Sequence, residues 1–223
     1  MLSSKDEYRN IWNIITIAEV LIAVIVIILD LFIPTIVILG LIVISLVIHY
    51  EGITSLGFIR ARSFTQMAGF VFISVCIWQL FQIGFTMPVL NHLTGATQNL
   101  SAFINLKGNL GQLLIFLAFT WTLAGFGEEI VYRGYLQERL SELFGTSTIG
   151  LILTVGISSF LFGIAHTEQG VIGVAVTFLD AIFFSWLKMK FDNNLWAAIL
   201  AHGFSNSIGL IIFYLVGPLY GLW

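Results

Sequence analysis

The sequence predicts an all-α integral membrane protein, a polytopic bundle of about seven transmembrane helices. Of its 223 residues, 58% are hydrophobic and only 9% are charged, and the mean hydropathy is +1.00. Soluble domains carry about a quarter charged residues, so this composition excludes them. The apolar residues form long runs, and backbone groups in lipid must pair within their own segment, which favours helices. No internal repeat or separate soluble domain interrupts the runs.

A transmembrane helix needs about 20 mostly apolar residues, and seven segments meet or approach that length. The fourth is long enough to project from the membrane, and the second is short enough to be tilted or interfacial. Residues 88–107 form the one sizeable loop expected, lying on the membrane surface. The expected spans are 10–32, 34–50, 66–87, 109–138, 148–166, 170–188 and 195–217.

The basic residues predict the orientation, because positive charge collects on the cytoplasmic side of a membrane. With seven spans, one side receives every basic residue except Lys107. We therefore expect a cytoplasmic N-terminus and an external C-terminal end, "GPLYGLW". The short N-terminus favours a prokaryotic plasma membrane. The basic residues of the cytoplasmic side are Lys5, Arg9, Arg60, Arg62, Arg133, Arg139, Lys188 and Lys190.

Two features exclude other classes of protein. The single cysteine, Cys76, can form neither an internal disulfide nor a cysteine-based metal cluster. The net charge of −3 argues against nucleic acid as a partner. The lipid bilayer and a membrane-bound or amphipathic peptide are the expected partners.

The segment "GFGEEIVYRGYL", residues 125–136, places three charges inside the fourth apolar run. Such groups are costly in a membrane and usually functional. Glu129 and Arg133 have the i, i+4 spacing of a helical ion pair. Glu128 points about 100° away and has no local partner. A carboxylate of this kind suits a general base or acid.

Two later runs add further polar side chains at the same spacing. Phe162 and His166 lie in "SSFLFGIAHTEQG", and His202 and Asn206 lie in "AAILAHGFSNSIG". With Glu128, they supply the groups for hydrolysis: a base, an orienting histidine and donors for an oxyanion.

A structural interpretation stands beside the catalytic one. Histidines in membrane helices often serve only packing or hydrogen bonding, and an i, i+4 Glu–Arg pair is often structural. Asp180 and Glu19 are interpreted as helix-packing or cavity-facing groups. Spacing by itself supports no more than a polar cavity.

The motifs "EEIVYR", "FGIAH" and "HGFSN" resemble those of the CAAX-processing and bacteriocin-processing (CPBP, or Abi) family of intramembrane proteases. The family pattern reads EExxxR, FxxxH and Hxxx(N/D), in this order on successive helices. The resemblance covers roughly residues 120–210, and residues 1–60 carry none of it. We expect N-terminal spans in 1–65 and a catalytic helical bundle in 66–223.

The resemblance implies an intramembrane endopeptidase related to the CAAX prenyl proteases. Glu128 and His166 would activate a water molecule. His202 and Asn206 would stabilise the oxyanion. Glu129 and Arg133 would brace the helix, with Phe162 in a supporting position.

A metal ion stays an alternative for this site. Glu128, His166 and His202 could hold zinc, although zinc sites rarely use an asparagine amide. No HExxH motif is present. The favoured site therefore needs no metal or other cofactor.

The depth of His166 is a conflict within the prediction. At a rise of 1.5 Å per residue, Glu128 lies about 16 Å and His202 about 12 Å from the cytoplasmic boundary. His166 falls almost a full span from it. Either the fifth span begins below the interface, or "HTEQG" breaks the helix inside a hydrated cavity.

Two other functions remain open at this point. One is a catalytically silent scaffold or bacteriocin-immunity protein of the same fold. The other is a proton-coupled transporter, against which stands the lack of an internal repeat. Prenylated C-terminal peptides, bacteriocin leaders and pheromone precursors are all conceivable substrates of a protease.

Overall fold

The computed structural model describes residues 4–218, and these contain helices and no strand. Its α-helices are α1 (Ser4–Ile28), α2 (Pro34–Ile48), α3 (Phe64–Phe81), α4 (Met87–Thr94), α5 (Leu110–Phe119), α6 (Gln137–Phe144), α7 (Thr148–Ile164), α8 (Gly170–Lys190) and α9 (Leu195–Val216). Three π-helical segments are η1 (Gln82–Thr86), η3 (Thr120–Glu128) and η4 (Ile130–Leu136). Two 3₁₀ turns are η2 (Ser101–Phe103) and η5 (Thr167–Gln169).

The predicted all-α membrane bundle is confirmed. Among the described residues, five helical stretches are long and apolar enough to cross a membrane. The other two predicted spans are the shorter helices α2 and α7, with 15 and 17 residues. The count of seven and the orientation stay predictions. Of the end predicted outside, residues 217–223, the last five lie beyond the described part. The five stretches are Asn10–Ile28, Phe64–Thr94, Leu110–Phe144, Thr167–Lys190 and Leu195–Val216.

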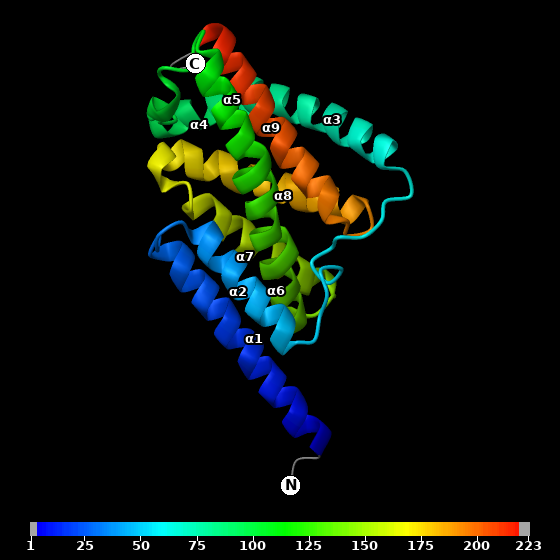
Figure 1. Ribbon diagram of the computed structural model, residues 1–223. Coiled ribbons are helices and arrows are strands. Elements are labelled where there is room, and N and C mark those ends of the chain that lie inside the picture. Colours follow the sequence, from blue (N-terminus) through cyan, green and yellow to red (C-terminus); the bar gives the residue numbers. More distant parts are fainter. Residues whose placement is uncertain (1–3, 219–223) are drawn as a thin grey trace.

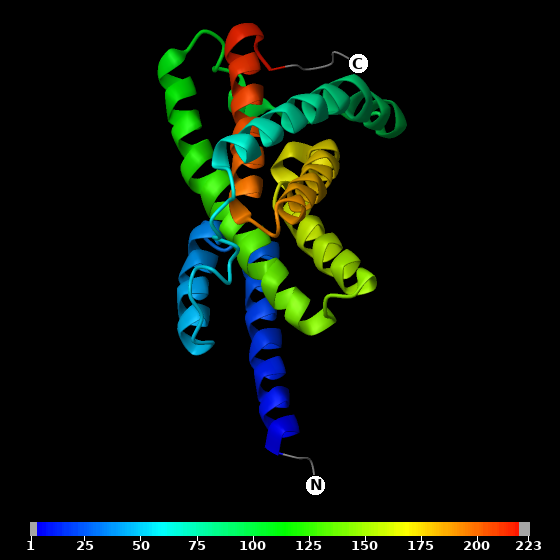
Figure 2. The same cartoon turned by 90° about the vertical axis from the view of Figure 1, so that its right-hand side faces the viewer.

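One long helix organises the molecule (Figure 1). It begins as α5, continues through η3 and η4, and ends as α6. The helices α1 and α2 pack near its α6 end, where α1 extends beyond the rest of the bundle (Figures 1 and 2). Near the other end, α9 runs beside η3 and α5, and α3 lies across α9 (Figure 2). The start of α1 and the end of α9 therefore lie at opposite ends of the molecule.

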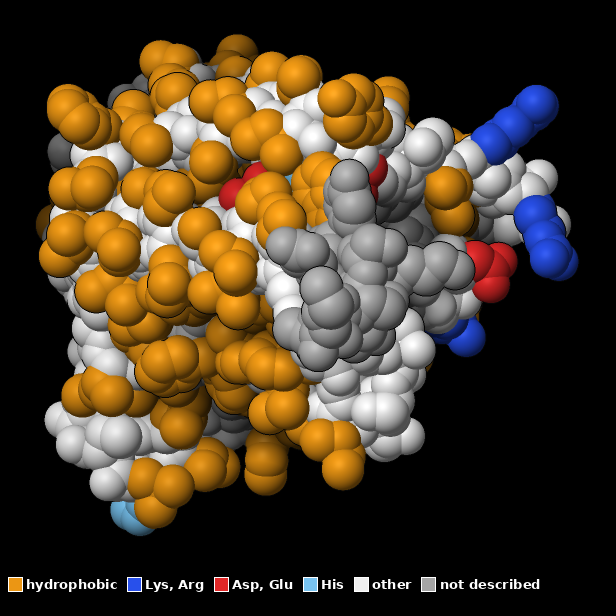
Figure 3. All heavy atoms as spheres, turned by 90° about the horizontal axis from the view of Figure 1, so that it is seen from below, with side chains coloured by type: hydrophobic (Ala, Val, Ile, Leu, Met, Phe, Trp, Pro, Cys, Tyr) orange, Lys and Arg blue, Asp and Glu red, His pale blue; other side chains and the backbone are white. Residues whose placement is uncertain are grey.

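Apolar side chains cover most of the face shown in Figure 3, and the lysine and arginine side chains visible there gather along one edge. Large hydrophobic residues are exposed along the outer faces of the helices, among them Ile14, Leu80 and Ile152. A contiguous apolar surface of this extent matches a lipid environment. The chain is thus an integral membrane protein.

The stretch 88–107 is not one loop, contrary to the sequence-based expectation. Residues 87–94 continue the helical line of α3 and η1 as α4. Pro88 occupies the first turn of α4, where the missing N–H of proline is tolerated. The helix stops at Gly95, whose φ of 66° is left-handed. Irregular chain with the turn η2 then leads to α5.

A second difference concerns the wide turns of the central helix. The sequence predicts regular α-helix with 3.6 residues per turn, whereas most of 120–136 has π-helical hydrogen bonding. Gly125 suits this stretch, because a Cβ there would lie 2.9 Å from the carbonyl oxygen of Thr120 and 3.3 Å from the amide nitrogen of Gly203. A larger residue would push η3 away from α9. π-Helical segments occur frequently at functional sites.

Arg139 connects the N-terminal helices to the central helix. Its buried guanidinium pairs with Glu19 of α1 at 3.3 Å, with Glu51 after α2 at 2.8 Å, and with Glu142. Partial burial alone would raise the pKa of Glu51, but the hydrogen bonds and charge of Arg139 hold that pKa below its usual value. His49 also contacts Glu19, at 3.2 Å. Glu19 is therefore a helix-packing group, one of the two interpretations of the sequence.

Candidate active site

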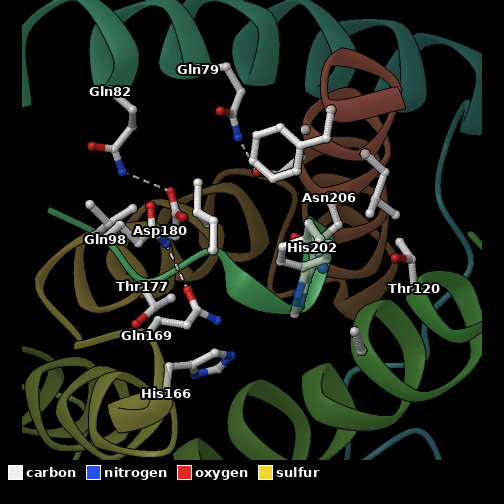
Figure 4. A pocket seen from close by; sticks show the side chains of 18 of the residues that line it. Gln79, Gln82, Gln98, Thr120, His166, Gln169, Thr177, Asp180, His202 and Asn206 are labelled. Carbon is white, nitrogen blue, oxygen red and sulfur yellow. Dashed lines mark hydrogen bonds between the residues drawn. The ribbon is translucent and has the colours of Figure 1, made fainter. Parts of the chain in front are cut away.

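A cavity of about 580 Å³ lies between α3 and η1, the central helix, the α7–α8 connection and α9. Its lining is mostly apolar, with polar side chains from each of these elements (Figure 4). The four residues predicted to be catalytic all line it, and so does the supporting Phe162. They are Glu128, His166, His202 and Asn206.

Glu129 and Arg133 form the predicted ion pair. Arg133 Nη1 donates to Glu129 Oε1 at 2.8 Å, and the side chains are 1% and 0% exposed. The Arg133 guanidinium also lies 4.4 Å from the centre of the Phe162 ring, in cation–π geometry. The phenylalanine of the second motif therefore packs on the arginine of the first.

Glu129 has a second partner, which the sequence analysis missed. His202 Nδ1 contacts the same carboxylate oxygen, Oε1, at 2.8 Å. A carboxylate only accepts hydrogen bonds, so Nδ1 carries the hydrogen and donates it. The ring is further fixed by stacking on Phe184, 5.3 Å between centroids. Glu129 thus orients His202, leaving Nε2 as the ring nitrogen that can serve the cavity.

Glu128 lines the cavity, whereas Glu129 does not. The Oε2 atoms of both carboxylates are buried without a hydrogen-bond partner among the described residues, but only that of Glu128 belongs to a residue of the cavity. The absence of a local partner that the sequence predicts is therefore maintained in three dimensions for this oxygen. A buried acceptor without a donor is costly, and a catalytic role is one explanation for such an atom.

His166 lies in the break between α7 and α8. The helix α7 ends at Ile164, and His166 begins the turn that contains η5. Its Nδ1 donates to the backbone oxygen of Phe162 at 2.8 Å, which leaves a lone pair on Nε2 of the neutral ring. His166 and Gln169 of this turn both line the cavity. The helix breaks at the cavity, one of the two arrangements that the sequence left open, and the depth of His166 in the membrane stays a prediction.

Close helix packing brings α9 to η3. A Cβ on Gly203 would lie 2.5 Å from the ring of Trp121, so only glycine fits this contact. Trp121 Nε1 donates to Ser207 on α9 at 3.1 Å. The side chains of His202 and Asn206, on the same helix, are thereby held opposite Glu128 of η3.

Lys188 supports the wide turns, and the sequence did not single it out for this role. Its buried Nζ donates to the backbone oxygen of Arg133, in η4. In the sequence, Lys188 served only as one of the basic residues that predict the cytoplasmic side. No sequence pattern indicated that α8 packs this side chain against η4.

The described residues show no side-chain arrangement typical of a metal site. Within residues 4–218, no group of three or more His, Cys, Asp and Glu side chains is arranged to hold a metal ion. Glu128, His166 and His202 line one cavity without converging in that way. We derive no step through zinc, and metal independence stays a prediction.

A comparison with known protein families tests the resemblance of the three motifs. Residues 110–208 match the family model described as "Type II CAAX prenyl endopeptidase Rce1-like". This part of the chain, fewer than half of its residues, is similar to that family. The match runs from the start of α5 into α9 and contains every predicted site residue. It confirms the resemblance predicted from the motifs and supports, for the family, an intramembrane peptide hydrolase.

The comparisons with curated proteins and with solved structures found no match. The boundary between the N-terminal spans and the catalytic part, predicted at 65/66, stays a prediction.

Proposed function

We propose that this Rce1-like protein is an intramembrane endopeptidase that hydrolyses a peptide bond of a membrane-associated peptide. The observation that carries the proposal is the convergence of three separate motifs on one cavity beside a carboxylate oxygen without a partner. Lipid-modified C-terminal peptides of CAAX type are the first candidates for its substrate, in line with the family description. A prokaryotic plasma membrane is the proposed location.

In this proposal Glu128 acts as the general base. A water molecule binds between Glu128 and His166. One of its protons is transferred to the Glu128 carboxylate, and its other O–H donates a hydrogen bond to the Nε2 lone pair of His166. The water oxygen attacks the carbonyl carbon of the scissile bond. Glu128 then delivers the proton to the leaving nitrogen, and the tetrahedral intermediate collapses with cleavage of the C–N bond to a carboxyl group and an amine.

His202 and Asn206 stabilise the negative oxygen of the tetrahedral intermediate. The Asn206 amide donates from its NH₂ group. Because Nδ1 of His202 donates to Glu129, Nε2 donates to the oxyanion only when the ring is protonated. One oxyanion donor typically contributes about 10²–10³-fold to the rate.

The proposal is tested by comparing membrane peptides from cells that produce wild type or Glu128→Ala protein. We expect a cleaved peptide, identified by mass spectrometry, that disappears with Glu128→Ala. The matched control is Glu168→Ala, a change of an exposed glutamate on η5. Identical peptides from wild type and Glu128→Ala cells would favour the silent scaffold instead.

Metal independence is tested on the purified protein. We expect substoichiometric zinc and unchanged cleavage after treatment with a chelator, because the cavity supplies its own base and oxyanion donors. Stoichiometric zinc, with activity lost on stripping and restored on refilling, would replace this mechanism by one that uses a metal.

A further inference from the structure

The active-site cavity contains a second carboxylate, Asp180 of α8, for which hydrolysis has no use. Figure 4 shows Asp180 and Gln82 on one side of the cavity and His202 and Asn206 on the other. Asp180 Oδ1 accepts hydrogen bonds from Trp78 Nε1 and, at 3.1 Å, from Gln82 Nε2. Asp180 is thus cavity-facing, one of the two interpretations that its sequence position allows.

The hydrogen bonds of Asp180 and Gln82 leave one oxygen of each side chain without a donor among the described residues. Both bonds of Asp180 go to Oδ1, and its Oδ2 accepts none from any residue that the structure describes. Because Gln82 points its NH₂ group to Asp180, its Oε1 is left buried without a partner. Gln82 is 2% exposed. An asparagine would suffice to connect α8 with α3 and η1, so the second carboxylate oxygen is surplus to a packing role.

The charges of the cavity are also unbalanced. Its lining within residues 4–218 includes Glu128 and Asp180 but no lysine or arginine. Arg133 does not line the cavity, and its Nη1 donates to Glu129. The two carboxylates of the lining therefore have no lysine or arginine beside them among the lining residues. A carboxylate in an apolar membrane cavity is stabilised by a cation that binds beside it.

We propose that Asp180 and Gln82 form a specificity subsite that binds a lysine or arginine side chain of the peptide. The cation donates hydrogen bonds to Asp180 Oδ2 and Gln82 Oε1, while the scissile carbonyl faces His202 and Asn206 across the cavity. The enzyme therefore selects peptides with a basic residue close to the cleaved bond. This subsite rests on the proposed endopeptidase function.

The test uses farnesylated peptides in which one lysine moves along the sequence, each paired with a peptide that has norleucine at that position. Binding of dye-labelled peptides is measured by fluorescence anisotropy, and cleavage is measured in parallel. At one position, wild type should bind the lysine peptide at least about tenfold more tightly, as expected for a hydrogen bond between charged groups. Asp180→Asn, which keeps the shape and one acceptor, should abolish this preference.

Asp192→Asn is the matched control, because Asp192 is exposed after α8 and should leave the preference unchanged. The subsite is refuted if no lysine peptide binds more tightly than its norleucine partner, or if the preference survives in Asp180→Asn. Cleavage without a lysine preference removes the subsite and leaves the endopeptidase. A preference that depends on Asp180, without cleavage of any peptide, removes the endopeptidase and leaves the subsite.

Discussion

At the scale of residues, the adjacent carboxylates of Glu128 and Glu129 face different surroundings. Glu129 is enclosed, and its Oε1 accepts from both Arg133 and His202. Glu128 lines the cavity with an oxygen that has no donor. We propose that Glu129 positions other side chains and that Glu128 takes part in the chemistry.

The sequence predicted half of this arrangement. The i, i+4 spacing gave the pair of Glu129 with Arg133, since both residues belong to one helix. The contact of Glu129 with His202 joins residues 73 positions apart on different helices, and helical periodicity contains no information on it. The hydrogen bonds of Asp180 to Trp78 and Gln82 were inaccessible for the same reason.

Arg133 separates positioning from chemistry. Arg133→Ala removes one partner of a buried ion pair and its packing on Phe162, so we expect the free energy of unfolding to fall by about 3–5 kcal/mol. Thermal unfolding in detergent measures the loss. Arg60→Ala, at an exposed position, is the control. An Arg133→Ala protein as stable as wild type but inactive would assign Arg133 to the reaction itself.

At the scale of elements, the apolar runs predicted that helices exist but not their internal geometry. The end of α7 at Ile164 and the π-helical turns of η3 and η4 depend on contacts with α8 and α9. Those contacts join separate helices, so the periodicity of 3.6 residues per turn within one helix cannot predict them. Both departures occur at the cavity, where they place His166 and Glu128.

The contact between η3 and α9 should limit both stability and activity. In Gly203→Ala the added methyl group meets the Trp121 ring at 2.5 Å. We expect a loss of about 1–3 kcal/mol, typical of overpacking, and slower cleavage because Asn206 and His202 move relative to Glu128.

Gly156→Ala on α7 is the matched control, since no atom lies within 4 Å of the added Cβ. The higher helix propensity of alanine should leave this variant as stable as wild type or slightly more stable. Equal melting temperatures and equal cleavage rates for the two variants would show that the close packing of η3 on α9 does not position the site.

At the scale of the whole molecule, composition predicted the membrane bundle, and charge asymmetry predicted its orientation. How the helices pack, with α3 across α9 and α1 and α2 at the other end of the central helix, was not predictable, because outward and inward faces are both apolar in lipid. Amphipathic patterning therefore does not specify how the N-terminal helices pack. The buried ion pairs of Arg139 provide a specific contact between these helices and the rest of the bundle.

The orientation is tested with reporters fused after Phe191, between α8 and α9, and after Trp223. We expect the first to be cytoplasmic and the second extracytoplasmic, because the basic residues collect on one side of the seven-span arrangement. Both reporters on one side of the membrane would contradict that arrangement.

The central claim is that Glu128 takes the proton from the attacking water, and Glu128→Gln tests it most directly. Glutamine keeps the shape of the side chain but removes its basicity, and no hydrogen bond to Oε2 is lost. The measurement is kcat/KM on a verified peptide substrate, with thermal unfolding as the control for folding. We predict a protein that melts like wild type and cleaves at least about 10²-fold more slowly. Near-normal turnover by a correctly folded Glu128→Gln protein would contradict the account.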